Sequence, residues 1–473
     1  MINSKEFRKY AHEFVDWMAD YLETVENLPV KSQVKPGEIF SKIPDQAPES
    51  GESMDEIFRD FQDIIMPGMT HWQSPNYFAY FTANSSYPSV LAEMLTSTMA
   101  AQCMVWDTSP AAAELEEKVM NWLRDMTGLP DTFEGVIQDT ASTATLVAFL
   151  TAREKVSDYR INEEGFSGEE RFRIYCSTEA HSSIEKAVKM AGFGRKNLVK
   201  IEVDDALAIL PDKLEEAVVK DLREGNVPLC VVAALGTTGT VAIDPLEPLA
   251  EICQRHGIWL HVDAAYAGTA LVLPEQRWMI RGIEGVDSFV FNPHKWMFTN
   301  FDCSAYYVKD TEALIRTFEI LPEYLKTGTR GQVNDYRDWG VQLGRRFRAL
   351  KLWFVIRDYG VEGIRQKIQD HLSWADELAE AIKKTDGFEL FEPQHLGLVC
   401  FRYVPSGEDD PEKLNLLNQE LMQKLNEGGK IFLTHTKVGG LVTLRMVVGQ
   451  TNVTRDHVMR AWELIRETAG LLK

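Results

Sequence analysis

The sequence has few cysteines, and they are not arranged to cross-link the chain or to bind a metal ion. Its six cysteines are scattered, and no two of them form a C-x-x-C pair. Disulfide frameworks and structural zinc sites both need grouped cysteines, so we expect neither, and no metal site at all. The pattern favours a reducing, cytoplasmic compartment. These cysteines are Cys103, Cys176, Cys230, Cys253, Cys303 and Cys400.

Long apolar runs and an excess of basic residues are also missing. No run reaches the roughly 18 apolar residues of a membrane span, and charges interrupt the N-terminal residues, unlike a signal peptide. The chain carries 71 acidic and 50 basic residues, with a formal net charge of −21. This charge argues against nucleic acid and anionic membranes as partners. We also find no internal repeat, which excludes solenoid architectures.

What remains is an ordinary globular composition, with 45% hydrophobic and 26% charged residues. A chain of 473 residues exceeds one ordinary core, so two or three domains are expected. Apolar residues from Phe7 to Val25 recur at helical spacing and predict an amphipathic N-terminal helix. We expect a helical arm over residues 1–85, a large domain over 86–360 and a small domain over 361–473.

The large domain is expected to be an α/β fold. Between about residues 135 and 310, continuous apolar strands alternate with helices, which is typical of a mostly parallel sheet covered on both faces. A long helix is predicted around residues 342–358. The last segment, from about 388 to 470, reads β-β-α-β-β-α and predicts a small α+β domain.

A lysine follows one of the predicted buried strands. The strand beginning at Asp287 ends at Pro293, and Lys295 comes directly afterwards in the sequence N-P-H-K-W. Open α/β sheets bind their ligands beyond such strand ends. A partly desolvated lysine at this place is a candidate Schiff-base nucleophile, although a solvated lysine is the ordinary alternative.

Two further stretches match the needs of pyridoxal phosphate. Asp263 ends a strand in H-V-D-A-A-Y-A-G, and an aspartate can hold the pyridine nitrogen protonated while a lysine binds the aldehyde carbon. A short strand after Val136 enters a turn containing Thr140, Ala141 and Ser142, followed by a helical run. Such a helix start offers N–H groups to the cofactor phosphate.

Together with A-H-S-S at 180–183 and H-W-Q-S-P at 71–75, these motifs occur in an order that resembles the pyridoxal-dependent group II decarboxylases. Within that family, the chain is most similar to the aromatic L-amino acid decarboxylases. The resemblance implies the type I fold of pyridoxal-phosphate-dependent transferases. It also implies a homodimer with the active site at the subunit interface, in which the N-terminal arm packs on the second subunit. Packing of the arm on its own chain is the alternative.

The resemblance also assigns roles to the cofactor-side residues. It places His181 against the cofactor ring and near the substrate carboxylate, and Thr237 near the cofactor. Asn292 is expected to contact the phosphate, and His294 either the phosphate or the leaving carboxylate. For the histidines and Asn292, a purely structural role is the alternative. The expected cofactor-binding residues are Thr140, Ala141, Ser142, His181, Thr237, Asp263, Ala265, Asn292, His294 and Lys295.

On the substrate side, the resemblance implies that Trp72, Tyr80 and Phe81 line the pocket, whereas dense aromatics in an unrecognised chain would be core. Met104 stands where animal relatives carry an aromatic residue, and Gly344 stands where relatives for smaller substrates carry serine. Tyr324 matches the family's proton donor, in a glycine-bearing segment expected to form a lid. The expected substrate-binding residues are Trp72, Tyr80, Phe81, Met104, His181, His294, Tyr324 and Gly344.

The predicted function is decarboxylation of an aromatic L-amino acid of the tryptophan, phenylalanine, tyrosine or dopa class to the arylalkylamine and carbon dioxide. An oxygen-dependent aromatic acetaldehyde synthase is the near alternative, and in the family that switch accompanies loss of the lid tyrosine or the stacking histidine. A group II decarboxylase for glutamate or cysteine sulfinate, an aminotransferase and a non-catalytic binding protein are further alternatives. We expect Lys295, Tyr324, His181 and Asp263 to be the catalytic residues.

Overall fold

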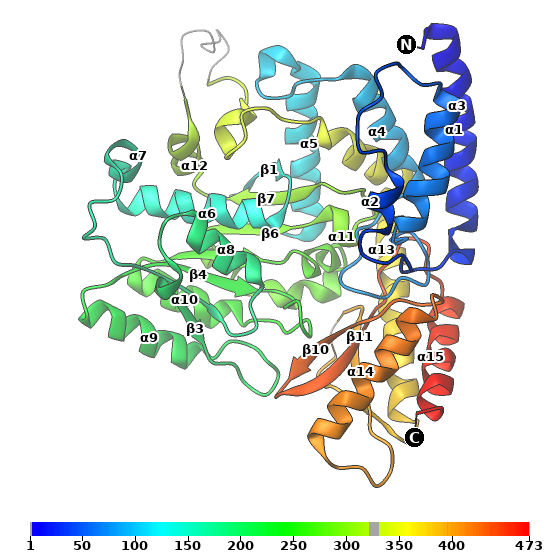
Figure 1. Ribbon diagram of the computed structural model, residues 1–473. Helices are drawn as coiled ribbons and strands as arrows, with labels where there is room; N and C mark the ends of the chain where they lie inside the picture. Colours follow the sequence, from blue (N-terminus) through cyan, green and yellow to red (C-terminus); the bar gives the residue numbers. More distant parts are fainter. Residues whose placement is uncertain (1, 321–330, 395, 473) are drawn as a thin grey trace. The chain divides into compact units, whose positions relative to one another are not determined.

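The computed structural model describes residues 2–320, 331–394 and 396–472 (Figure 1). It divides into two compact units. The central unit comprises Ala83–Ser373 and Glu392–Leu398, and the terminal unit comprises Met1–Thr82, Trp374–Phe391 and Val399–Lys473. The predicted division at residues 85 and 360 remains a prediction.

The central unit is built on a seven-stranded sheet, with the strands in the order β1-β7-β6-β5-β4-β2-β3. Neighbouring strands from β3 to β6 run parallel, while β7 runs antiparallel to both β1 and β6. The predicted mostly parallel sheet is therefore confirmed. The strands are β1 (Glu134–Gln138), β2 (Phe172–Ser177), β3 (Leu198–Ile201), β4 (Val227–Ala234), β5 (Trp259–Asp263), β6 (Ser288–Phe291) and β7 (Ser304–Val308).

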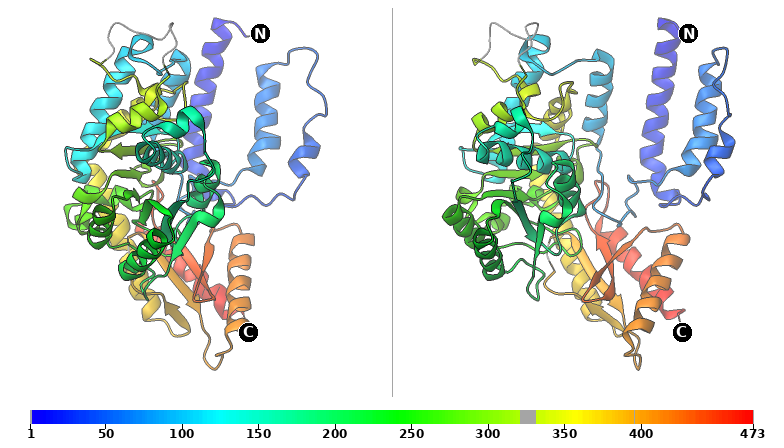
Figure 2. Two further views of the ribbon diagram at one scale, coloured as in Figure 1. Left: turned by 90° about the vertical axis from the view of Figure 1, so that its left-hand side faces the viewer. Right: turned by 60° about the vertical axis from the view of Figure 1, so that its left-hand side comes forward.

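Helices lie on both sides of this sheet (Figures 1 and 2). β4 to β7 are buried along almost their whole length, so most of their side chains are apolar. Among the described residues the helices are α4 (Tyr87–Met99), α5 (Pro110–Thr127), α6 (Ala141–Val156), α7 (Arg160–Glu164), α8 (Ser182–Met190), α9 (Pro211–Arg223), α10 (Leu246–His256), α11 (Pro293–Trp296) and α12 (Thr311–Phe318).

The long helix predicted around residues 342–358 differs in its bounds. Helix α13 runs from Arg348 to Lys383, with a kink at Gly360, where φ is 64°. Gly360 interrupts the helical backbone, so the expected end near residue 358 falls at this break. A second helical segment follows, in which Ile364, Ile368 and Leu372 recur every four residues and are buried.

The terminal unit contains a four-stranded sheet with the order β10-β11-β9-β8, in which β10 pairs antiparallel with β11 and β8 with β9. Two helices pack on it, with Trp462 and Phe401 edge to face at 5.9 Å. The predicted α+β tail is confirmed. Its elements are β8 (Phe388–Leu390), β9 (Leu398–Tyr403), α14 (Pro411–Glu427), β10 (Thr434–Val438), β11 (Leu441–Val447) and α15 (Arg455–Gly470).

The N-terminal arm belongs to the terminal unit. Helix α1 (Ser4–Thr24) begins with a capping box on Asn3, and runs beside α3 (Met54–Asp60) in Figure 2; the short α2 (Glu38–Lys42) lies between them in sequence. Phe14 contacts Phe58 at 4.5 Å between ring centroids. No residue of α1 is buried, so this contact leaves much of the amphipathic helix exposed.

All six cysteines are buried, and none of them forms a disulfide. In the described part of the chain, no helix combines the length and the hydropathy that a membrane crossing requires.

Gly268→Ala tests the close packing beside β6. A Cβ on Gly268 would lie 2.3 Å from Cβ of Phe291, so the strand must shift, and we expect destabilisation by about 1–3 kcal/mol or more. Gly363→Ala is the control: in α13 its Cβ meets only Cβ of Tyr359, at 3.6 Å, and alanine should stabilise the helix by about 1 kcal/mol. Thermal unfolding measures both, and equal stability of the two variants would contradict the packing.

Candidate active site

Three ionisable side chains meet at the carboxyl-terminal ends of the central strands. Asp263 is the last residue of β5, Lys295 lies in α11 just after β6, and His181 is the N-cap of α8, beyond β2. Burial lowers the pKa of the His181 imidazole, while Asp263 raises it and Lys295 lowers it. The three groups therefore lie within electrostatic reach of one another. Sequence analysis grouped these three residues, and the structure brings them together.

Local hydrogen bonds define the tautomer of His181. Its Nδ1 accepts the backbone N–H of Ser183 at 3.2 Å and lies 2.7 Å from that residue's Oγ. Because a backbone N–H can only donate, Nδ1 carries the lone pair and Nε2 carries the proton. With its pKa below the usual value, the ring is neutral at pH 7 and presents an N–H donor from Nε2.

The backbone around Lys295 is held from the sheet. The N–H of Lys295 donates to the carbonyl of Asn292 at 2.8 Å, and the N–H of Asn292 donates to the carbonyl of Ala265 at 3.0 Å. The side chain of Asn292 accepts a hydrogen bond from Ser304 Oγ at 2.7 Å. The segments that carry Asp263 and Lys295 are thus joined directly through Ala265 and Asn292.

His294 is buried next to Lys295. Its Nδ1 accepts the backbone N–H of Cys303 at 2.9 Å, so its proton also resides on Nε2. Burial and the charge of Lys295 lower the pKa of His294 to about 3. His294 is therefore a neutral hydrogen-bond donor at physiological pH.

The N-terminus of α6 is where an anion site was predicted, and its role in binding an anion remains a prediction. Thr140 is the N-cap, and its Oγ1 accepts the N–H of Thr143 at 3.4 Å. The N–H groups of Ala141 and Ser142 belong to the first turn of the helix. The N–H groups of a first turn have no acceptors within the helix. Ser304 Oγ contacts both the carbonyl of Asp139 at 3.3 Å and Asn292, so this helix start lies beside the lysine segment.

Thr237 is part of a tight turn after β4. It is buried, its Oγ1 accepts the N–H of Ala242 at 3.0 Å, and its own N–H donates to the carbonyl of Ala242 at 3.0 Å. Gly236 before it has a φ of 89°, and a Cβ there would lie 2.9 Å from Cβ of Ala267. These bonds give Thr237 a structural contact, and its position near the cofactor remains a prediction.

A buried polar network behind Asp263 was missed from the sequence. His261 Nδ1 lies 2.9 Å from Ser288 Oγ, which also accepts the indole N–H of Trp259, and His261 Nε2 lies 3.4 Å from Thr145 Oγ1. The network ties β5 and β6 to the first turns of α6. Burial lowers the pKa of His261 to about 4 against the opposing effect of Asp263. The H-x-D alternation within one strand was the only sequence signal.

Met104 and Gly344 lie elsewhere in the central unit. The carbonyl of Met104 accepts the N–H of Arg337 at 2.9 Å. A Cβ on the exposed Gly344 would lie 3.1 Å from Nε2 of Gln102. No contact among the described residues joins either position to Asp263, so their substrate roles remain predictions.

The three predicted substrate aromatics belong to the terminal unit. Trp72 stacks with Tyr77 at 4.5 Å and with Tyr80 at 6.0 Å. Tyr80 is 51% exposed and has a φ of 53°, an uncommon value for a bulky residue. Phe81 is buried with Arg445 at 5.4 Å from its ring. The exposed Tyr80 next to Trp72 forms an open aromatic surface.

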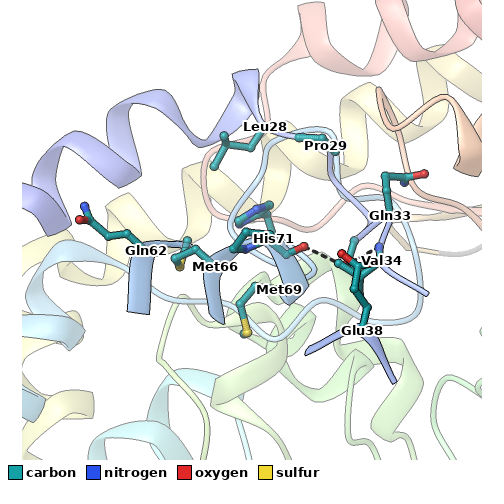
Figure 3. Close-up of a pocket in the computed structure, with 11 residues that line it drawn as sticks. Leu28, Pro29, Gln33, Val34, Glu38, Gln62, Met66, Met69 and His71 are labelled. Atoms are coloured by element: carbon teal, nitrogen blue, oxygen red, sulfur yellow. Dashed lines mark hydrogen bonds between the residues drawn. The ribbon is translucent and has the colours of Figure 1, made fainter. Parts of the chain in front are cut away.

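A separate cavity of about 510 Å³ lies in the terminal unit beside His71 (Figure 3). Apolar side chains such as Leu28, Met66 and Met69 line much of it. His71 Nδ1 is engaged by the hydroxyl of Tyr21 at 2.9 Å. None of the predicted site residues lines this cavity.

Tyr324 lies outside the described residues.

Comparison with known proteins identifies the family. A family profile described as the pyridoxal-dependent decarboxylase conserved domain matches residues 36–404. The chain belongs to this decarboxylase family. Its cofactor is accordingly pyridoxal phosphate.

The relatives include two kinds of enzyme. The chain is 42% identical to a phenylacetaldehyde synthase of Arabidopsis thaliana, covering 100% of this chain and 97% of the relative. It is 41% identical to tryptophan decarboxylase 2 of Oryza sativa subsp. japonica, covering 99% and 95%. Sequence identity alone therefore does not separate a decarboxylase from a synthase.

Solved structures confirm the fold. The model superposes on the crystal structure of Oryza sativa TDC with PLP and tryptamine with a TM-score of 0.96, at 37% identity and covering 100% of this chain and 99% of the other. A Rhodiola rosea 4-hydroxyphenylacetaldehyde synthase gives a TM-score of 0.92, at 35% identity and covering 100% of both chains.

The residues of this decarboxylase fit its cofactor. Pyridoxal phosphate needs a primary amine for its aldehyde, a carboxylate for its ring nitrogen and N–H donors for its phosphate. The central unit brings Lys295, Asp263 and the start of α6 together through Asn292 and Ser304. A Cβ on Gly268 would lie 2.3 Å from Cβ of Phe291, so the packing beyond β5 leaves no space for a side chain at this position.

Acid should destabilise the decarboxylase through its buried histidines. Burial lowers the pKa of His371 to about 3, against 6.5 for an ordinary histidine, and its Nδ1 accepts the indole N–H of Trp296 at 2.9 Å. Between these two pKa values the unfolded chain binds a proton at His371 and the folded chain does not. The contribution of neutral His371 to the free energy of unfolding is therefore complete above about pH 6.5 and is lost as pH falls toward 3.

His371→Gln, which keeps an acceptor for Trp296, should therefore flatten the fall in stability between pH 6.5 and 4. The expected change is up to one proton, or about 1.4 kcal/mol per pH unit. The exposed His435→Gln is the control and should leave the slope unchanged. Unfolding curves across this pH range measure the slopes, and equal slopes for wild type and His371→Gln would refute the assignment.

Proposed function

We propose that this enzyme converts an aromatic L-amino acid to the corresponding arylalkylamine and carbon dioxide. The observation that carries the proposal is the electrostatic grouping of Asp263, Lys295 and His181. It occurs in a chain that is 39–42% identical over nearly its whole length to plant enzymes acting on tyrosine and tryptophan or producing phenylacetaldehyde. The substrate is assigned by analogy to an aromatic amino acid.

In this proposal, Lys295 holds the cofactor covalently through its side-chain amine. Asp263 holds a proton at the ring nitrogen, and the N–H groups of Ala141 and Ser142 bind the phosphate with Thr140. When bound, the cofactor supplies an electron sink for the electron pair that carbon dioxide leaves behind.

The histidines act as neutral groups. His181 Nε2–H faces the reacting atoms and can donate to the substrate carboxylate without adding a positive charge that would retain it. His294, also neutral, donates from Nε2 with Asn292 alongside. A retained positive charge would favour the bound carboxylate over its release, so depressed pKa values suit a decarboxylase.

Two further assignments complete the proposal. Tyr324 protonates the substrate carbon after carbon dioxide leaves, and exclusion of water by its segment protects that step. Trp72, Tyr80 and Phe81 contact the aromatic ring of the substrate, with Met104 and Gly344 shaping the space for it. The six cysteines are all buried and form no disulfide, which supports a reducing, cytoplasmic compartment.

The second candidate is an oxygen-dependent aromatic acetaldehyde synthase. The chain is 42% identical to a phenylacetaldehyde synthase. This relative supports the synthase as strongly as the decarboxylase relatives support the decarboxylase. Such an enzyme would consume one oxygen and one water molecule and release the aldehyde, ammonia, hydrogen peroxide and carbon dioxide. The presence of Tyr324 and His181 favours the decarboxylase, since the resemblance links their loss to the switch.

Tyr324→Phe tests both candidates. The wild type should release amine and carbon dioxide in equal amounts without peroxide, and the variant should lose amine formation by about 10²–10⁴-fold because the proton donor is gone. Lys295→Ala should abolish all products, whereas the exposed Lys437→Ala should match the wild type.

Carbon dioxide, amine, aldehyde and peroxide are measured together for tryptophan, phenylalanine, tyrosine and dopa. Peroxide and aldehyde from the wild type would assign it as the synthase.

The functional form is proposed to be a homodimer with its active site at the subunit interface. Exposed apolar residues on α4 support the proposal that a second subunit covers this helix face: Leu91 is 52% exposed and Leu95 47%. On the arm, Phe7 and Ile57 are also exposed. Large apolar side chains repeated along one helix face mark a protein interface.

Replacing Leu91 and Leu95 together with aspartate should yield a monomer, because burying two carboxylates opposes association. Light scattering measures the mass, and activity should fall with it. Met190→Asp is the control, since Met190 is 62% exposed on α8 and lies outside that face. A dimeric double variant would refute the role of α4.

A further inference from the structure

The short helix α11 leaves backbone carbonyls that need partners. It contains four residues, Pro293–Trp296, and the carbonyl of Pro293 accepts the N–H of Met297 at 3.1 Å. The last carbonyls of any helix have no partner within it. In α11 these include the carbonyls of His294 and Lys295, the two residues that the proposed function places at the cofactor.

Asn84 meets both of these carbonyls. Its backbone N–H donates to the carbonyl of His294 at 2.9 Å, and its side-chain Nδ2 donates to the carbonyl of Lys295. Asn84 is only 1% exposed, so water cannot readily take over the bond if the side chain is removed. Two residues later, Ser86 Oγ donates to the carbonyl of Phe298 at 2.7 Å and extends the same contact.

The lysine segment is thereby held from two sides. On the sheet side, Asn292 is fixed by Ala265 and Ser304. On the other side, Asn84 is the side chain that holds the Lys295 carbonyl. The two sets of hydrogen bonds restrict the backbone of Lys295. The position of this backbone decides where the side-chain amine of Lys295 can reach.

We propose that Asn84 is a positioning residue for Lys295. The inference deepens the proposed function and rests on it, because it assumes that Lys295 carries the cofactor. Removing the Asn84 amide takes this donor away from the Lys295 carbonyl and lets the helix move. Reacting groups misplaced by about 1 Å can lose up to 10²-fold in rate. Asparagine is specific here because the isosteric aspartate has no side-chain N–H and would direct an oxygen at the carbonyl.

The test compares Asn84→Ala and Asn84→Asp with Asn418→Ala. Asn418 is a matched control in the terminal unit: it is fully buried, and its Nδ2 donates to the carbonyls of Tyr403 and Leu414, both at 2.8 Å. All variants are purified with the cofactor. The apparent pKa of the lysine–cofactor bond is read from its visible absorbance against pH, cofactor release is followed by protein fluorescence, and thermal stability is measured in parallel.

We expect both Asn84 variants to shift that apparent pKa by about half a unit or more and to release the cofactor about tenfold faster. With substrate, kcat should fall about tenfold while KM changes less than twofold. Asn418→Ala should lose thermal stability with none of these changes. A shift in the Asn84 variants no larger than in Asn418→Ala would overturn the inference and leave Asn84 a purely structural residue.

Two controls separate this inference from the proposed function. If the wild type shows no lysine–cofactor absorbance, or if Lys295→Ala retains it, the assignment of Lys295 fails. If the absorbance depends on Lys295 but the Asn84 variants behave like wild type, only the role of Asn84 fails. If Asn84→Ala does not fold, Asn84→Asp and Asn84→Ser decide in the same assay. Serine has a hydroxyl donor, so its apparent pKa should lie closer to the wild-type value than that of Asn84→Asp.

Discussion

The constraint on which the site depends is the parallel arrangement of β4, β5 and β6. Parallel strands end at the same edge, so the aspartate that closes β5 and the lysine that follows β6 lie near each other, although 31 positions separate Asp263 from Lys295 in the sequence. The N–H of Asn292 reaching the carbonyl of Ala265 ties these two ends together. Other parts of the candidate site, from the start of α6 to His181 at α8, are arranged around that edge.

Burial supplies the second organising effect. His181, His261, His294 and His371 all have a pKa below that of an ordinary histidine, and in each case burial is the first cause. The site is therefore surrounded by neutral imidazoles in a chain with a net charge of −21. A neutral ring can donate a hydrogen bond to a carboxylate without binding it as an ion pair. This distinction matters for a reaction in which the carboxylate must leave as uncharged carbon dioxide.

Much of the fold and part of the site could be predicted from the sequence. The apolar runs ending at Asp263 and Pro293 predicted strands that the structure contains almost residue for residue, because a strand buried on both faces requires continuous apolar side chains. The start of α13 was misplaced: a helix was expected from about residue 342 but begins at Arg348, while its expected end near residue 358 falls at the kink at Gly360. The His261 network and the contact of Asn84 were not foreseen, because hydrogen-bond partners far apart in sequence leave no local pattern.

The sequence by itself determined the family, the cofactor and the order of strands and helices, since short motifs with fixed chemistry and continuous apolar periodicity are local properties. Only the tertiary structure decided which groups are neutral and which backbone atoms are held. The pKa of His294 depends on atoms packed around it from distant segments, and the carbonyl of Lys295 finds its donor 211 residues earlier, in Asn84. Burial and long-range hydrogen bonds are consequences of the folded arrangement, because they exist only after segments remote in sequence have come together.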